Sequence, residues 1–319
     1  MTRVLITGAT GFVGRPLCRA LLGSGFEVRA AVRSHSAVSE PGCEPAVVGD
    51  IDANTDWSSA LNGVDVIVHA AARVHVMNDR GGSGAYDQIN VEGTRRLATE
   101  AARAGVRRFL FLSTVKVNGE NTPAGPFTAG DAPHPRDEYG RSKWRAEQVI
   151  AEICAATRME HVIVRPPLVY GPGVKANFLR LMIWVDEERL MPLGAVDNLR
   201  SLVSIWNLVD LLRLAVSHPA AAGRVWLVSD GVDLSTPQLI RRIGAAMQRN
   251  VRLLRVPVLA LRLGGWLARR PEISRLCGSL TVDASPAREL LGWSAPVTVD
   301  QSLERTVGWY LSEGRSRAR

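Results

Sequence analysis

Cysteine is scarce in this chain of 319 residues, and no C-x-x-C pair occurs among Cys18, Cys43, Cys154 and Cys277. Such spacing is typical of reduced thiols in a cytoplasmic protein, and we expect that location. The six histidines include no H-x-x-H or H-E-x-x-H spacing, so the sequence predicts no metal site. No apolar run reaches the roughly 18 residues of a membrane span, so we expect no membrane insertion.

Acidic residues are in deficit, since 39 Lys and Arg stand against 31 Asp and Glu, a net charge of +8. Many arginines occur as dispersed pairs, namely Arg95-Arg96, Arg107-Arg108, Arg241-Arg242 and Arg269-Arg270. Dispersed pairs without interleaved aromatic residues are typical of solvated helix faces, so no nucleic-acid partner is predicted. A negatively charged small-molecule substrate fits the same excess. With 46% hydrophobic and 22% charged residues, the chain is globular rather than disordered.

The first half of the chain alternates short apolar runs with segments of helical spacing. Runs rich in Val, Ile and Phe predict strands at Arg3–Thr7, Val28–Val32, Ala46–Val48, Val64–His69, Phe109–Ser113 and His161–Val164. Helices are predicted between them, at Arg15–Leu22, Trp57–Leu61, Tyr86–Ala104 and Glu138–Ala156. Strands that are apolar on both faces and separated by helices indicate an α/β class with a doubly wound parallel sheet. We place this domain at residues 1–165.

The second half is less regular, and we expect residues 166–319 to form a smaller mixed domain, interleaved with the first. It contains a predicted strand at Arg224–Val228, a helix at Gln238–Gln248 with Thr236 as N-cap and Pro237 at its first position, and a terminal helix at Gln301–Leu311. Residues Glu313–Arg319 are expected to fray. The apolar and basic segment Val256–Arg270 could lie on a membrane surface, but Gly264-Gly265 weakens an autonomous helix, so packing within this domain is favoured.

A glycine-rich turn joins the first strand to the first helix, with Gly8, Gly11 and Gly14 in the spacing G-x-x-G-x-x-G. Gly8 permits a sharp turn, Gly11 lets the backbone approach a pyrophosphate, and Gly14 lets the helix pack closely on the strand. Backbone N–H groups at the helix N-terminus then bind phosphates. The turn therefore predicts NAD(P) binding in a Rossmann-type domain, through Gly8, Thr10, Gly11, Phe12, Val13 and Gly14.

The predicted second strand lacks a carboxylate at its end, where Arg33 stands instead. An acidic residue there would bind a free ribose 2′-hydroxyl, whereas an arginine accommodates a 2′-phosphate, so Arg33 favours NADP without excluding NAD. The alternative is that Arg33 stacks on adenine with either cofactor. Asp50 and Ile51 follow the third strand and are predicted to contact the adenine, although Asp50 could equally be a helix N-cap.

Tyr139 and Lys143 lie four residues apart near a predicted helix start, which puts both side chains on one helix face. An unperturbed tyrosine has a pKa near 10 and is a poor base at neutral pH. A neighbouring Lys⁺ and a positive nicotinamide ring favour the phenolate, so we expect the pKa of Tyr139 to move towards neutrality.

These motifs together resemble the extended short-chain dehydrogenases/reductases, the NAD-dependent epimerase/dehydratase family that acts on nucleotide-sugars. The resemblance spans roughly residues 2–311 and is also carried by His69-Ala70-Ala71-Ala72, Asn90-Val91-Glu92-Gly93-Thr94, Leu112-Ser113-Thr114, the run Arg165 to Gly173, Leu291-Gly292-Trp293 and Trp309-Tyr310.

The resemblance implies roles for individual residues. Thr114 would join Tyr139 at the reacting oxygen, and Lys143 would also hydrogen-bond the nicotinamide ribose. Further cofactor contacts are implied at Ala70, Ala71, Ala72, Asn90, Ser113, Pro166 and Val169, and substrate contacts at Thr114, Lys116, Asn177, Phe178 and Arg200. For Arg200, which would bind the diphosphate, the alternative is a surface ion pair. A homodimer is also implied, with the helices Tyr86–Ala104 and Glu138–Ala156 forming a four-helix bundle across a two-fold axis.

The chain also departs from the family pattern. Val117-Asn118-Gly119 replaces the frequent V-Y-G, and the carboxylate of NAD-preferring members is absent from the second strand. The polar, glycine-rich loop Val76–Gly84 could be a mobile lid or a simple connection.

By this resemblance the chemistry is alcohol/ketone redox at C4 of a UDP-linked hexose. The runs Pro166 to Phe178 and Val115 to Gly119 resemble reductases that form UDP-N-acetylquinovosamine from UDP-2-acetamido-2,6-dideoxy-hexos-4-ulose in lipopolysaccharide and O-antigen synthesis, so such a reductase is expected. A UDP-hexose or UDP-N-acetylhexosamine 4-epimerase is the alternative. A non-catalytic NADP-binding regulator is a more remote one.

Overall fold

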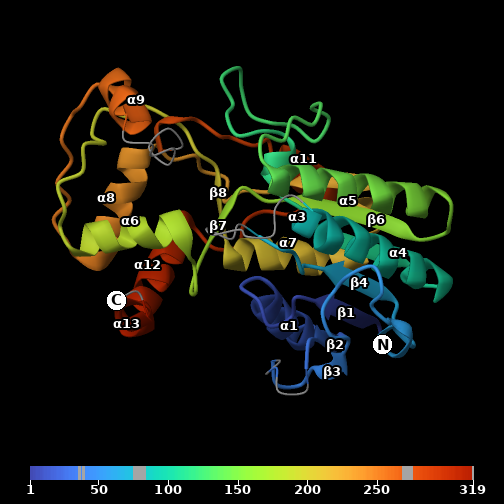
Figure 1. Ribbon diagram of the computed structural model, residues 1–319. Coiled ribbons are helices and arrows are strands. Elements are labelled where there is room, and N and C mark those ends of the chain that lie inside the picture. The colour runs from blue at the N-terminus through green and yellow to red at the C-terminus, as the bar shows by residue number, and fades with distance from the viewer. Residues whose placement is uncertain (35–36, 38–39, 75–83, 268–275, 318–319) are drawn as a thin grey trace.

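The computed structural model describes residues 1–34, 37, 40–74, 84–267 and 276–317. Its main feature is a seven-stranded parallel sheet in the order β3-β2-β1-β4-β5-β6-β9 (Figure 1). The strands are β1 Arg3–Thr7, β2 Glu27–Val32, β3 Glu44–Val47, β4 Val66–His69, β5 Arg108–Leu112, β6 Glu160–Arg165 and β9 Arg224–Leu227. The order reverses direction beside β1, which confirms the doubly wound sheet predicted from the sequence.

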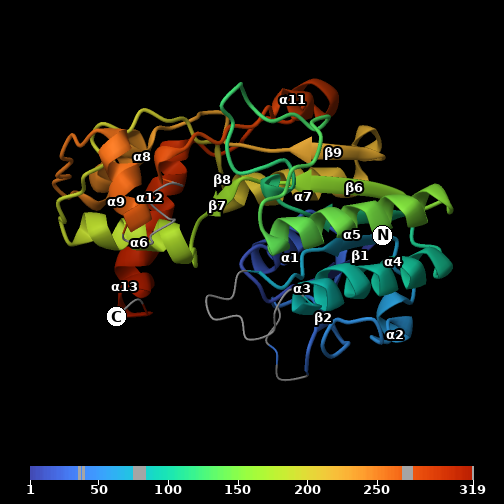
Figure 2. The same ribbon diagram turned by 45° about the horizontal axis from the view of Figure 1, so that its top comes forward.

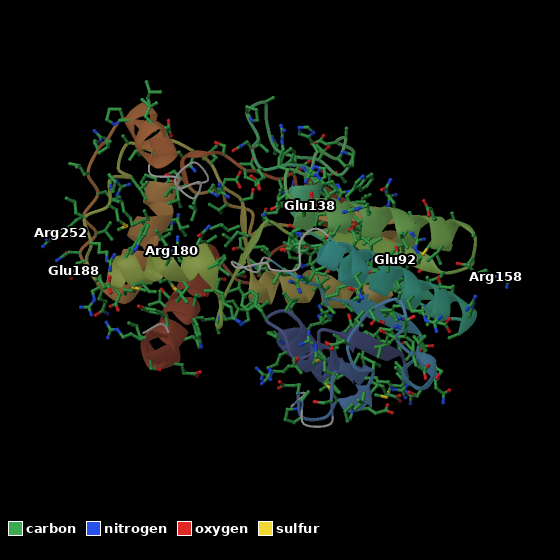
Figure 3. The ribbon with its side chains drawn as sticks, in the orientation of Figure 1. Glu92, Glu138, Arg158, Arg180, Glu188 and Arg252 are labelled. Atoms are coloured by element: carbon green, nitrogen blue, oxygen red, sulfur yellow. The ribbon has the colours of Figure 1, made fainter. Side chains whose placement is uncertain are left out.

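Helices cover both faces of this sheet (Figures 1 and 2). Helices α1 (Gly14–Gly23) and α7 (Ile205–Ser217) lie on one face, and α4 (Gly93–Arg103) and α5 (Glu138–Ala155) lie on the other. Charged side chains project outward from the layers, for example Glu92 and Arg158 (Figure 3).

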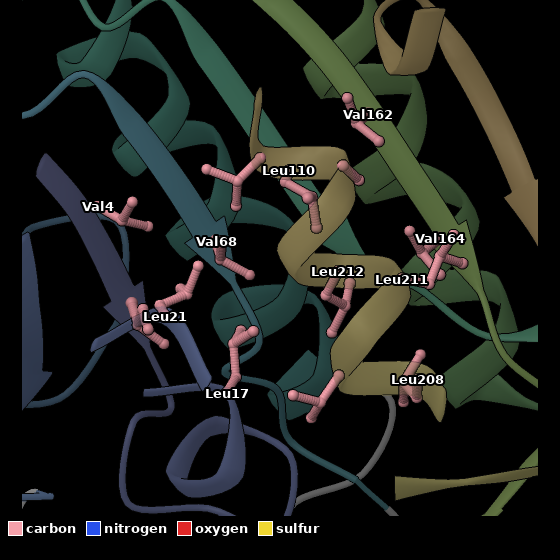
Figure 4. Packing of buried hydrophobic residues seen from close by; sticks show 14 of the residues in the cluster. Val4, Leu17, Leu21, Val68, Leu110, Val162, Val164, Leu208, Leu211 and Leu212 are labelled. Carbon is pink, nitrogen blue, oxygen red and sulfur yellow. The ribbon is translucent and has the colours of Figure 1, made fainter. Parts of the chain in front are cut away.

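Successive residues of each strand point to opposite faces, so one strand serves two cores. Val4 and Ile6 of β1 pack against leucines of α1 and α7, as Figure 4 shows for Val4, Leu17, Leu21, Leu208, Leu211 and Leu212. Leu5, between them in sequence, packs instead with the residues that face α4 and α5, such as Leu97 and Ile150. This two-sided burial explains why the strands read as nearly continuous apolar runs.

The predicted helix Tyr86–Ala104 is three segments in the structure. A short helix α3 (Gly84–Asp87) passes into a π-helical turn η1 (Gln88–Glu92) and then into α4. Asn90 lies in the π-helical turn, and such turns recur at functional sites. The remaining short helices of this layer are α2 Ser58–Leu61, η2 Val115–Val117, η3 Pro219–Ala221 and α11 Ser285–Leu291.

A smaller layer stands beside the sheet (Figure 1). It contains a two-stranded parallel sheet and helices around a core of their own, namely β7 Leu168–Tyr170, β8 Leu202–Ser204, α6 Ala176–Asp186, α8 Thr236–Met247, α9 Val258–Leu267 and α12 Val299–Trp309. Both α7 and β9 follow residue 165 in sequence but belong to the larger layer. The domain division at residue 165 stays a prediction.

Two expectations for the second half are wrong. Ser235, not Thr236, is the N-cap of α8: its hydroxyl accepts from the Gln238 N–H, while the Thr236 hydroxyl donates to the Leu276 carbonyl at 2.7 Å. The chain end does not fray from residue 313. A π-helical turn η4 (Tyr310–Gly314) and a short helix α13 (Arg315–Arg317) continue α12, and Arg315 pairs with Asp186.

The apolar and basic segment around α9 packs on the smaller layer as expected, because Val256, Val258 and Leu261 contact its core. Within the described residues, no helix combines the length and apolar character that crossing a membrane requires.

Candidate active site

The glycine turn between β1 and α1 is closed tightly by its own backbone. Gly8 has φ +68°, and a Cβ atom there would lie 2.8 Å from the Ala71 nitrogen. A Cβ atom on Gly14 would lie 2.0 Å from the Gly8 carbonyl oxygen, so only glycine fits at that position. Thr10 and Gly11 are exposed at the tip of the turn. The geometry is that of a loop that can present its backbone to a phosphate.

Phe12 and Val13 follow the tip and hold the turn in place. Phe12 packs against the cores of both layers, and Val13 packs against the core that faces α1 and α7. The cofactor loop is therefore attached to the smaller layer as well as to the sheet.

The chain after β4 approaches the same turn. The Ala71 N–H donates to the Thr7 hydroxyl at 3.1 Å, and Ala70, Ala71 and Ala72 are half-buried. Asn90 is buried, with its amide bonded to both backbone groups of Arg73 and to the Ser142 hydroxyl. Asn90 thus fixes the path of the segment after β4 and ties it to α5.

His69, the last residue of β4, is fully enclosed. Its ring nitrogens lie 2.6 Å from the Thr7 hydroxyl and 3.0 Å from the Thr94 hydroxyl. Burial, aided by the charge of Lys143, lowers the pKa of His69 to about 3. The imidazole is therefore neutral at physiological pH and links β1, β4 and α4.

Tyr139 and Lys143 lie in the first turns of α5, which Asp137 caps by accepting from the Gly140 N–H at 2.8 Å. Tyr139 is half-buried, and burial together with the Asp137 and Tyr86 charges raises the pKa of its phenol. In the chain alone this direction is opposite to the shift expected with the cofactor bound, and that shift stays a prediction. The expectation assumed a positive cofactor ring beside the phenol, whereas here burial decides the direction.

Lys143 is buried, and its Nζ donates to the Leu112 carbonyl at 2.7 Å and stands 4.1 Å above the Phe111 ring. Burial lowers its pKa to about 7, against the opposing effect of Glu147. A positive charge on Lys143 is therefore stabilised by the Leu112 carbonyl, the Phe111 ring and the Glu147 carboxylate.

Ser113 and Thr114 follow Leu112 at the end of β5, so both lie near Lys143. The Ser113 hydroxyl donates to Glu147 and is buried, which commits it to the protein interior. Thr114 is half-buried and is the N-cap of η2, where its Oγ1 accepts from the Lys116 N–H at 3.3 Å. Of the two residues, Thr114 is the more exposed.

A buried ion pair that involves the helical turn after Lys143 was not predicted from the sequence. Glu147, one turn after Lys143 on α5, pairs through both carboxylate oxygens with Arg165 at the end of β6. Arg165 also donates to the Asn118 side chain at 3.0 Å, and Asn118 donates to the Thr128 carbonyl at 2.9 Å. The departure from the family pattern at Asn118 is thus an inward-facing amide. The local sequence feature that pointed to Glu147 was its position four residues after Lys143, on the same helix face.

Lys116 lies beside Tyr139, with its Nζ 6.0 Å from the centre of the Tyr139 ring. It forms ion pairs with Asp137 and, at 3.7 Å, with Glu120. Lys116 is therefore next to Tyr139, as a substrate contact requires, and is held there by two carboxylates.

Arg33 and Asp50 stand at the ends of β2 and β3 and pair with each other at 3.1 Å, with exposed side-chain fractions of 84% and 83%. Asp50 is not a helix N-cap, since no described helix begins there. Ile51 lies against α4, where a Cβ atom on Gly93 would come within 2.9 Å of it. A carboxylate beside Arg33 opposes a 2′-phosphate at this site, which removes the physical basis for favouring NADP.

The remaining predicted contacts come from the junction of the layers. Pro166 accepts the Val115 N–H at 3.0 Å through its carbonyl, and Val169 lies in β7 against the larger core. Asn177 is half-buried in the first turn of α6. Phe178 is different: its ring is buried and stacks on Tyr170 with centroids 5.2 Å apart. A substrate contact through the Phe178 side chain is not available in this arrangement.

Arg200 links three segments of the smaller layer. Its backbone pairs with Leu234 and Leu280, and its Nη1 donates to the Gly278 carbonyl at 3.1 Å. The predicted loop Val76–Gly84 falls almost wholly outside the described residues. Among the described residues, no cluster of His, Cys, Asp and Glu could hold a metal ion.

The fold and these residues define a Rossmann-type nucleotide-binding protein with a tyrosine–lysine pair at the end of its sheet. A family model described as "NAD dependent epimerase/dehydratase family" matches residues 4–229, and the chain belongs to that family.

Two similar proteins are named as 4-epimerases. The chain is 44% identical over 314 residues to a UDP-glucose 4-epimerase of Vibrio cholerae, covering 97% of this chain and 95% of that protein. It is 27% identical over 326 residues to the N-acetyl-alpha-D-glucosaminyl-diphospho-ditrans,octacis-undecaprenol 4-epimerase of Escherichia coli O157:H7, covering 95% and 94%.

Solved structures share the fold. The UDP-glucuronic acid 4-epimerase of Bacillus cereus in complex with NAD has a TM-score of 0.78 at 21% identity, covering 97% of this chain and 98% of that one. The UDP-glucose 4-epimerase of Thermotoga maritima with UDP-glucose has a TM-score of 0.77 at 19% identity, with both chains fully covered.

Proposed function

We propose that this protein is a 4-epimerase of a UDP-linked hexose or N-acetylhexosamine. The observation that carries the proposal is the 44% identity, over 97% of the chain, to a protein named UDP-glucose 4-epimerase. The placement of Thr114, Tyr139 and Lys143 around the carboxyl end of β5 is compatible with that chemistry. The comparisons favour this alternative over the reductase expected from the sequence.

The cofactor of the proposed reaction is NAD. Gly8 and Gly14 permit the tight turn before α1, since Cβ atoms there would collide with backbone, and the exposed Gly11 would let a pyrophosphate approach the turn. The Arg33–Asp50 pair offers a carboxylate near the site of a free ribose hydroxyl. When bound, NAD would accept a hydride from the sugar C4 and return it, and would add positive charge beside Tyr139.

In the proposed mechanism Tyr139 transfers the proton of the 4-hydroxyl. Its pKa is raised in the chain alone, so the phenol is protonated, and positive charge at the site is needed before it can act as a base. Lys143, one helical turn after Tyr139, supplies part of that charge, and its bond to the Leu112 carbonyl fixes its position. The Thr114 hydroxyl holds the same substrate oxygen. The phenol then returns the proton after the 4-keto sugar has presented its other face.

We assign the substrate to the open side of Tyr139, between the layers. Lys116 would contact the sugar, Asn177 the nucleotide-sugar, and Arg200 the diphosphate by bidentate hydrogen bonds. We also propose a two-fold homodimer through α3–α4 and α5, for which light scattering at micromolar concentration should give twice the monomer mass.

Product analysis tests the proposal. Purified protein should interconvert UDP-glucose and UDP-galactose, or UDP-N-acetylglucosamine and UDP-N-acetylgalactosamine, without added cofactor. Stoichiometric consumption of NAD(P)H with a 4-keto-6-deoxy sugar, and no interconversion, would instead identify the reductase. The undecaprenyl-linked sugar diphosphate named for the Escherichia coli relative belongs in the same panel.

Tyr139→Phe should lower kcat about 10²- to 10⁴-fold with little change in substrate affinity, because it removes only the proton-transfer group. Tyr310→Phe, a matched change in the smaller layer, should leave kcat unaltered. Near-normal turnover by Tyr139→Phe would rule out the mechanism.

A further inference from the structure

At one end of the smaller layer lie leucines that the described residues leave exposed. Leu259 and Leu263 lie one turn apart on α9, with exposed fractions of 71% and 54%. Leu254, in the segment that leads into the helix, is 51% exposed. We call Leu254, Leu259 and Leu263 the leucine patch. It lies at the end of the smaller layer remote from β1, β2 and β3 in both views (Figures 1 and 2).

The opposite side of the same segment is anchored in the fold. Val256, Val258 and Leu261 pack against the core of the smaller layer. A helix on the surface of a globular protein is ordinarily polar on its outer face, whereas α9 carries the exposed Leu259 and Leu263 there. A clustered apolar face of this kind indicates a surface that meets an apolar partner.

The chain segment that carries the patch has charged residues of one sign only. Residues 249–267 contain four arginines and no aspartate or glutamate. Arg252 and Arg255 are exposed beside Leu254, and neither forms an ion pair with a described residue. Arg249 is paired with Asp186 and Glu187 with Arg189, and Glu188 is a further carboxylate nearby, so Arg252 and Arg255 supply the positive charge that remains beside Leu254. The surface thus combines exposed leucines with unneutralised guanidinium groups.

We propose that the leucine patch docks the protein peripherally on an anionic lipid bilayer. Leucine side chains would enter the boundary between headgroups and acyl chains while Arg252 and Arg255 meet anionic headgroups. A second copy of the chain fits the surface less well. A two-fold contact would set the patch against itself and oppose arginine to arginine. The docking surface is independent of the sugar chemistry proposed above.

Vesicle flotation with the full chain tests the proposal. Vesicles with 30 mol% phosphatidylglycerol should carry the protein, vesicles of phosphatidylcholine alone should carry much less, and high salt should release it. The double variant Leu259→Glu/Leu263→Glu should bind at least tenfold more weakly. Arg252→Gln and Arg255→Gln should each weaken binding about fivefold, as expected for roughly 1 kcal/mol per basic residue near an anionic surface.

Leu290→Glu is the matched control, because Leu290 is a 44% exposed leucine on α11 outside the patch. It should bind vesicles like the unaltered protein, and every variant should keep its turnover of a water-soluble UDP-sugar, which also reports folding. Equal vesicle binding by Leu259→Glu/Leu263→Glu and the unaltered chain would overturn the proposal. The proposal would also be overturned if the unaltered chain did not bind vesicles and formed a dimer that Leu259→Glu/Leu263→Glu dissociates. The patch would then be a contact between two copies of the chain.

Discussion

The two layers of the molecule differ in how deeply they bury charged side chains and in how they pair them. In the larger layer Arg108, Lys143, Glu147 and Arg165 are all at most 2% exposed, and the last three lie beside the carboxyl ends of β5 and β6. In the smaller layer Asp186, with 6% of its side chain exposed, pairs with Arg315 and Arg249 at the surface, and the buried Asp230 accepts hydrogen bonds from Tyr170, Ser204 and Asn207. Three of the four buried charges of the larger layer therefore lie where the proposed proton transfer occurs, and the smaller layer is held by apolar packing, hydrogen bonds and ion pairs with surface arginines.

This difference has an energetic reason. A charge inside a protein is strongly destabilising unless it is paired, but a paired and buried charge keeps a fixed position and a strong local field. Lys143 needs a fixed position and a strong local field if it acts on Tyr139. A surface that binds variable sugars needs neither. The contrast predicts large effects from substitutions in the larger layer and graded effects in the smaller one.

The largest effect is expected from Arg165→Met. It would leave Glu147 buried without its cation, at a cost of about 3–5 kcal/mol in the free energy of unfolding. Urea denaturation measures this change. Adding Glu147→Leu should restore much of the loss, because both charges are then gone. Arg315→Met should shift the midpoint much less, since Asp186 keeps Arg249 and the Tyr310 hydroxyl. Equal losses for the two arginines would refute the contrast between the layers.

Within the smaller layer, the neighbours Asn177 and Phe178 should separate binding from stability. Phe178→Ala removes a buried ring from its stack on Tyr170 and should cost about 3 kcal/mol of stability. Asn177→Ala should leave the unfolding midpoint in place and raise the KM for the UDP-sugar. Thermal unfolding and steady-state kinetics on both variants check this. A raised KM with unchanged stability for Phe178→Ala would mean that its ring contacts substrate after all.

The sequence predicted what depends on short-range spacing. The strands followed from runs apolar on both faces, Gly8 and Gly14 from the turn between β1 and α1, and the shared face of Tyr139 and Lys143 from the helical period. Contacts between distant segments were missed. Glu147 meets Arg165 only because α5 packs beside β6, and the pairing of Arg33 with Asp50 requires β2 and β3 to end side by side. The burial of Phe178 was likewise missed, because it depends on Tyr170 in another element.

A third prediction concerns pH and His69. The native state keeps this imidazole neutral down to a pKa of about 3, whereas the unfolded chain takes up a proton near pH 6.5. Stability that is present above pH 6.5 is therefore lost as the pH falls, by about 2 kcal/mol between pH 6 and pH 4. Urea midpoints across this range should fall more steeply for the unaltered protein than for His69→Gln, which cannot titrate. Parallel curves would show that other groups carry the acid sensitivity.

The smallest effect is expected at the exposed pair Arg33–Asp50, which lies almost fully in water beside the proposed cofactor site. Its energy is screened, so neither residue should matter for stability. Its effect should be confined to cofactor choice, since Asp50 repels a 2′-phosphate that Arg33 would otherwise attract. Asp50→Asn should raise the affinity for NADP relative to NAD about two- to fivefold, and Arg33→Ala should lower it by a similar factor. Cofactor titrations followed by fluorescence or calorimetry measure both ratios. If Asp50→Asn weakens NAD and NADP equally, Asp50 contacts a part of the cofactor common to both, such as the adenine. The discrimination would then have to come from another residue.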